Sequence, residues 1–158
     1  MAAWPEVLSA APRFETLDAG EAAEIEAIAA QIIPSTGGPG AREAGVIYFI
    51  DRALSTFASD DREAYRAGMG EIHRRRKELF PGSTSIASLS SEKQITLIHA
   101  VEKSDFFELI RTHTILGFLA SPSYGGNRGE VGWKQMGFED LMAYQYPFGY
   151  YDAEEGAR

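Results

Sequence analysis

Four residue pairs with the spacing of helix caps divide this chain into short segments that favour helices. In each pair an Asp or Ser precedes a Glu or Gln by three positions, so that each side chain can accept a hydrogen bond from a free backbone N–H at a helix start. The pairs are Asp18–Glu21, Asp60–Glu63, Ser91–Gln94 and Asp105–Glu108. Apolar residues spaced by three or four follow each pair, which gives each segment one face to bury.

These patterns predict an all-α, single compact domain of about five helices. The expected helices cover about 18–33, 41–58, 60–80, 91–101 and 105–121. The apolar stripe of the second helix comprises Val46, Ile50, Ala53, Leu54 and Phe57. No segment shows the sustained alternation of polar and β-branched residues that is typical of a strand, so no strand is expected.

Two segments of different character flank the helical domain, which we assign to residues 18–138. Residues 1–17 form an irregular N-terminal arm, because Pro5 and Pro12 interrupt any long helix. Residues 139–158 form an aromatic and acidic C-terminal tail, and glycines and aromatic residues are already frequent after Ser121. The fold is therefore expected to end in a glycine- and aromatic-rich loop and tail.

Composition excludes several classes of site and partner. The chain has 158 residues, no cysteine and a net charge of −8. A thiolate metal site, a disulfide framework and a cysteine nucleophile are therefore impossible. The negative charge disfavours nucleic acid and anionic membranes as partners, and no segment is long and apolar enough to predict a membrane span. The basic run at 73–77 is interpreted either as a solvated helix end or, less simply, as a docking patch for an acidic partner.

The sequence predicts no catalytic, cofactor-binding or metal-binding residue in this chain. The three histidines are too far apart in sequence to form a metal pair on one helix, and no nucleophile elbow is present. Two alternatives remain open. One is a homo-oligomer held together by the aromatic C-terminal tail, and the other is a protein that acts alone. A stand-alone ligand-binding protein or enzyme would use His99 or His113 as acid–base candidates, with Tyr124 or Arg128 holding the substrate.

The glycine-rich segment 121–133 is the strongest candidate for a functional loop. Its glycine spacing matches neither a dinucleotide-binding loop nor a P-loop, so a backbone-shaping role is left. Such a loop would present side chains in one fixed arrangement, and the aromatic residues that follow it suit a protein interface. We therefore predict partner binding by Tyr124, Gly125, Gly126, Asn127, Arg128, Trp133, Phe138, Tyr144, Tyr146 and Phe148.

Two segments resemble the signatures of one known family, that of gluconate 2-dehydrogenase subunit 3. The first signature segment is residues 39–51 (PGAREAGVIYFID), preceded by Ile33 and Pro34. The second signature segment is residues 114–138 (TILGFLASPSYGGNRGEVGWKQMGF), which is long and unusual.

The resemblance implies a non-catalytic accessory subunit of a sugar or alcohol dehydrogenase. In such complexes the large subunit is a flavoprotein of the glucose–methanol–choline type, which holds FAD, and the small subunit is thought to help it mature. A cytochrome often accepts the electrons, so a cytochrome c subunit is a second expected partner. The resemblance implies a periplasmic location through a twin-arginine leader, whereas the first residues carry no export signal and favour the cytoplasm if Met1 is the native start.

Overall fold

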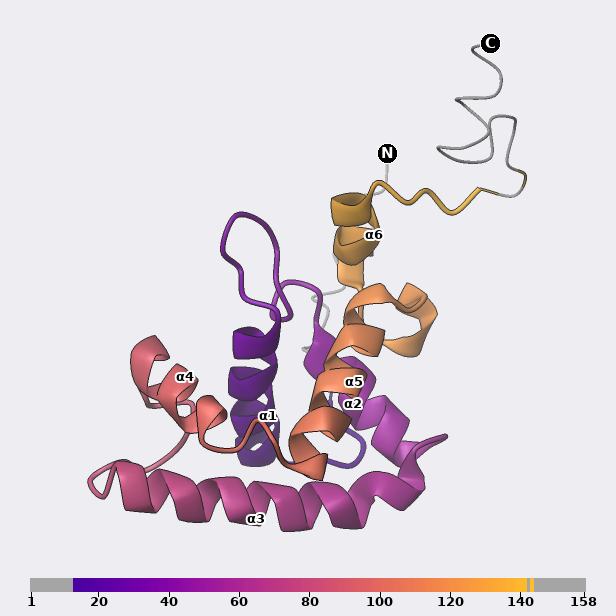
Figure 1. Ribbon diagram of the computed structural model, residues 1–158. Coiled ribbons are helices and arrows are strands. Elements are labelled where there is room, and N and C mark those ends of the chain that lie inside the picture. Colours follow the sequence, from indigo (N-terminus) through magenta and orange to yellow (C-terminus); the bar gives the residue numbers. More distant parts are fainter. Residues whose placement is uncertain (1–12, 142, 144–158) are drawn as a thin grey trace, which may run out of the picture.

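The computed structural model describes residues 13–141 and 143, and within them the fold is entirely helical (Figure 1). The α-helices are α1 (Ala19–Ile32), α2 (Val46–Ser55), α3 (Arg62–Leu79), α4 (Ser91–His99), α5 (Asp105–Leu119) and α6 (Val131–Met136). Three single turns of 3₁₀-helix are η1 (Ser59–Asp61), η2 (Pro122–Tyr124) and η3 (Arg128–Glu130). The predicted all-α fold is confirmed, and α6 is a sixth, short helix within the expected loop.

The long helix α3 lies across one end of the molecule, and α6 lies at the other (Figure 1). Between them α2 and α5 form the central pair, with α1 packed against both. Buried aliphatic side chains fill the space between these helices, among them Ile25, Ile28, Ile50, Leu54, Leu97 and Ile110. Full burial of one such side chain contributes about 1.5–3 kcal/mol, so this cluster is the main source of stability.

Only the first of the four predicted capping pairs forms. The Asp18 carboxylate accepts from the Glu21 N–H at 2.8 Å, and the Glu21 carboxylate accepts from the Asp18 N–H at 3.0 Å. The pair predicted for α3 was wrong, because η1 leads directly into that helix and its N-cap residue, Asp61, makes no side-chain cap.

The other two predicted pairs do not form either. Gln94 is buried, and its amide donates to the carbonyls of Ile86 and Leu89, so its side chain does not cap the start of α4. Helix α5 begins at Asp105, but its N-cap is Ser104 and not the predicted Asp105, because the Ser104 hydroxyl accepts from the Phe107 N–H at 3.2 Å.

Helix α2 is shorter than the predicted 41–58. Residues 41–45 form turns instead, and Gly45 takes a left-handed conformation with φ of 64° just before the helix. At the other end, the hydroxyls of Ser55 and Thr56 both donate to the carbonyl of Arg52, which competes with continued helix.

The buried carboxylate of Asp51 attaches the segment before α1 to α2. It accepts hydrogen bonds from the backbone N–H groups of Glu15, Thr16 and Leu17, at 2.7, 2.9 and 2.8 Å. Since Asp51 is only 3% exposed, these charge-assisted bonds replace the water that the carboxylate loses on folding.

Candidate functional site

The loop after α5 is organised around one buried amide side chain, that of Asn127. This residue is fully buried in the left-handed region, with φ of 44°. Its side-chain NH₂ donates to the Ala120 carbonyl at 3.0 Å, and its side-chain oxygen accepts from the Gly132 N–H at 2.9 Å. Its own backbone N–H donates to the Gly117 carbonyl at 2.8 Å. One residue therefore joins the end of α5 to the start of α6.

Two glycines let the loop lie directly against the end of α5. A Cβ atom at Gly126 would lie 2.2 Å from the Gly117 carbonyl oxygen. A Cβ atom at Gly132 would lie 2.0 Å from the Phe118 carbonyl oxygen. Both obstacles are backbone atoms that cannot move aside, so these positions require glycine.

Arg128 connects the two signature segments. Its guanidinium lies over the Tyr48 ring, 3.6 Å from the ring centre, and its backbone N–H donates to the Ala44 carbonyl at 2.9 Å. The Phe14 ring stacks on the same tyrosine, with ring centroids 5.2 Å apart. A second arginine, Arg52 of α2, donates to the Ser123 carbonyl at 2.7 Å. The two segments, far apart in sequence, thus form one unit.

Trp133 is mainly a structural residue of this unit. It is half-buried, its indole N–H donates to the Leu119 carbonyl at 2.7 Å, and the Phe138 ring meets it edge to face. Of the residues predicted to bind a partner, Gly126 and Asn127 are buried, whereas Tyr124 and Phe138 are exposed. Three further predicted residues, Tyr144, Tyr146 and Phe148, lie outside the described residues.

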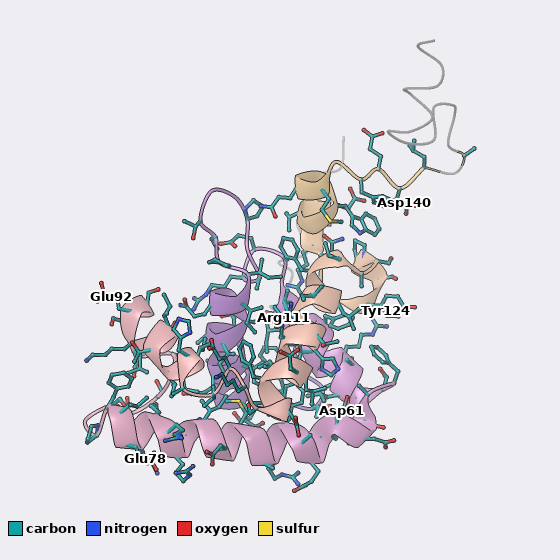
Figure 2. The ribbon with its side chains drawn as sticks, viewed as in Figure 1. Asp61, Glu78, Glu92, Arg111, Tyr124 and Asp140 are labelled. Atoms are coloured by element: carbon teal, nitrogen blue, oxygen red, sulfur yellow. The ribbon has the colours of Figure 1, made fainter. Side chains whose placement is uncertain are left out.

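An exposed aromatic pair stands on the outside of the loop. The Phe57 side chain is 63% exposed and that of Tyr124 is 51% exposed, and their rings meet edge to face at 6.4 Å. Figure 2 shows Tyr124 at the outer edge of the molecule. The prediction that Phe57 belongs to the buried stripe of the second helix was wrong, because α2 ends at Ser55 and its periodicity no longer applies. Sequence reasoning missed this pair for the same reason.

The two histidines of the alternative enzyme hypothesis lie in different surroundings. His99 is exposed and pairs with Glu102 at 2.8 Å. His113 is buried; its Nδ1 lies 3.0 Å from the Tyr65 hydroxyl, and its Nε2 lies 3.5 Å from the Asp61 carboxylate. Burial lowers the pKa of His113, although Asp61 opposes the shift, and burial raises the pKa of the Tyr65 hydroxyl. A neutral imidazole that accepts from Tyr65 fits both shifts.

Carboxylates of the same helix neutralise part of the basic run at 73–77. Arg74 pairs with Glu71 and Glu78, and Arg75 pairs with Glu78. Arg76 is buried and donates to Ser83.

Within residues 13–141, no group of three His, Asp or Glu side chains could hold a metal ion, and no helix has the length and apolar character to cross a membrane.

These features define a small helical protein with a rigid, glycine-shaped loop whose surface carries exposed aromatic side chains. The family model for gluconate 2-dehydrogenase subunit 3 matches residues 19–140, which is most of the chain. The chain therefore belongs to this family, which implies an accessory subunit of a dehydrogenase complex. No curated protein and no solved structure shows significant similarity to it.

Proposed function

We propose that this protein is the non-catalytic small subunit of an FAD-dependent sugar or alcohol dehydrogenase of the glucose–methanol–choline type. It binds the large flavoprotein subunit and stabilises it or helps it mature. The large subunit holds FAD and oxidises the substrate, and a cytochrome c subunit is a candidate electron acceptor. The proposal extends the family assignment, which covers residues 19–140, to a particular partner.

One structural observation supports this proposal most directly. The two signature segments form a single unit through Arg128 and Tyr48. Tyr124 of this unit and Phe57, which follows the first segment, form an exposed aromatic pair. Aromatic side chains are favoured anchors at protein interfaces, because they bury a large area at a small cost in conformational entropy. A rigid loop that presents such side chains suits recognition of another protein.

Co-purification with the large subunit tests the proposal. The two proteins are expressed together, with an affinity tag on the large subunit only, and the amount of small subunit retained is measured. We expect Tyr124→Ser to reduce retention at least tenfold, since truncation of an interface anchor typically costs more than about 1.4 kcal/mol. Ile95→Ser is the matched control, because Ile95 is a similarly exposed apolar residue on α4. If the wild-type subunit is not retained at all, the proposal is wrong.

A further inference from the structure

A groove lies between α1 and α3, on a face that the signature segments do not form. Its volume is about 440 Å³. Residues of α3 from Arg62 to His73 line it, and the opposite side is formed by α1 and by the residues that precede it, Thr16 to Asp18. The lining part of α3 is about 16 Å long at 1.5 Å per residue, which equals about five residues of extended chain.

The floor of the groove is apolar, and the groove is unobstructed at Gly70. Leu17, Ile25, Leu54 and Met69 supply aliphatic and thioether surface. Gly70 also lines the groove, and a Cβ atom there would meet no atom within 4 Å. Apolar surface thus lies next to open space in the groove.

The two walls carry charges of opposite sign. The α1 side presents Asp18, Glu21 and Glu24, whereas α3 presents Arg62 and Arg66. One polar contact crosses the groove: the Nε2 atom of His73 lies 3.3 Å from the Glu24 carboxylate.

Neither arginine of the α3 wall has a described contact with the carboxylates of α1. Arg66 pairs with Glu63 of the same helix, and Arg62 donates to the carbonyl of Leu54. Among the described residues, the carboxylates of α1 and the arginines of α3 therefore do not form ion pairs with each other across the groove.

The walls are fixed by hydrogen bonds outside the groove. Both carboxylate oxygens of Glu24 accept from the Ile86 N–H, at 2.9 and 3.1 Å. Asp51 holds Thr16 and Leu17 in place, and the Tyr65 hydroxyl bonds to His113. A groove whose walls are already ordered loses little conformational entropy when it binds.

We propose that this groove binds an extended segment of the large catalytic subunit. This inference rests on the function proposed above. The segment places an apolar side chain on the floor, a basic side chain opposite the carboxylates of α1, and an acidic side chain opposite Arg62 and Arg66. Charge complementarity of this kind fixes the direction and register of a bound chain. Because Glu21, Arg66 and Gly70 are exposed, the groove is open along its length, which suits a passing chain better than a small molecule that must be mostly enclosed.

The first test fills the groove without disturbing the fold. Gly70→Tyr places a ring in open space on α3, and replacing a helical glycine favours the helix, so the variant should fold. Ala67→Tyr is the matched control, because Ala67 is an exposed residue of the same helix that does not line the groove. With the tagged large subunit, we expect retention of Gly70→Tyr to fall about tenfold and that of Ala67→Tyr to stay within about twofold of wild type.

The second test identifies the occupant. A photo-reactive phenylalanine analogue is introduced at position 69 in the co-expressed complex, with position 95 as a control, and the cross-linked peptides are sequenced. We expect position 69 to cross-link to one segment of the large subunit. Cross-links only to residues 1–12 or 144–158 of this chain would show that its own termini fill the groove, and would overturn the proposal, as would wild-type retention of Gly70→Tyr. If the tagged large subunit does not retain even the wild-type small subunit, the proposed function itself is contradicted.

Discussion

The guanidinium of Arg128 lies 3.6 Å from the centre of the Tyr48 ring, and this contact joins the two signature segments of the chain. A cation over an aromatic face contributes about 0.5–2 kcal/mol, with the larger values at sites shielded from water. Arg128 is half-buried here, and it also donates to the Gly125 carbonyl at 3.3 Å. The contact therefore stabilises the loop and fixes it against α2.

Replacing Arg128 by alanine should lower the free energy of unfolding by about 1–2 kcal/mol, measured by urea denaturation. A double-mutant cycle with Tyr48→Leu should give a coupling of about 1 kcal/mol. Arg111→Ala is the control, since Arg111 is an exposed arginine that pairs with Glu108 of its own helix, and its loss should cost less than about 0.5 kcal/mol. Equal effects of the two substitutions would contradict the structural role of Arg128.

Replacing Asn127 by alanine should destabilise the protein by about 3 kcal/mol. The substitution leaves the buried Gly132 N–H and Ala120 carbonyl without their partner, and it places alanine in the left-handed region. Gln135→Ala, at an exposed position of α6, should change stability by less than about 0.5 kcal/mol. Urea denaturation of both variants checks this, and an Asn127→Ala variant as stable as wild type would show that the loop is not organised by this side chain.

Two glycines on α3 should respond to alanine in opposite directions. A Cβ atom at Gly68 would lie 2.0 Å from the ring of Phe106, so Gly68→Ala forces α3 and α5 apart and should destabilise by about 1–3 kcal/mol. At Gly70 the space is open, so Gly70→Ala should stabilise by about 0.5–1 kcal/mol through helix propensity alone. Thermal unfolding of the two variants compares them directly. Stabilisation by both substitutions would contradict the packing of Phe106 on α3.

Stability should fall as the pH drops below about 6.5, the ordinary pKa of histidine. Burial lowers the pKa of His113 in the folded state, so between its folded and unfolded pKa values the unfolded chain binds more protons. The stabilisation is complete above the unfolded pKa and is lost progressively as pH falls toward the folded one. His113→Gln should flatten this part of the pH–stability curve, because it removes the group that titrates. Urea midpoints between pH 5 and 8 measure the effect, and curves of identical shape for wild type and His113→Gln would refute it.

Residue spacing alone correctly predicted one capping box, whose two side chains bond only within the first turn of α1 in the described contacts. The Asp18–Glu21 box needs no other part of the chain, and it forms as predicted. Gln94 has the same spacing from Ser91, but its amide bonds to the loop at 86–89 and to Gln31 of α1 instead. A contact with a distant segment replaced the local one, and spacing alone does not show which of the two wins.

The glycines in the sequence located the loop, but the contacts that hold the loop in place depend on tertiary structure. The roles of Asn127 and Arg128 are set by carbonyl groups at Ala120 and Ala44 and by the Tyr48 ring, which come together only when α5 packs on α2. Helix α6 was missed because its N-cap residue, Glu130, takes a left-handed conformation with φ of 58° and makes no side-chain cap. The groove between α1 and α3 was missed because no single segment contains it.

The FAD content of the large subunit tests most directly whether this protein binds that subunit and helps it mature. The large subunit is purified after expression alone and after expression with this protein, and bound flavin per polypeptide is measured by absorbance. We predict substantially more flavin and higher dehydrogenase turnover with an artificial electron acceptor after co-expression, together with a stable complex of the two chains. Equal flavin content and equal turnover in both preparations, with no complex, would contradict the account.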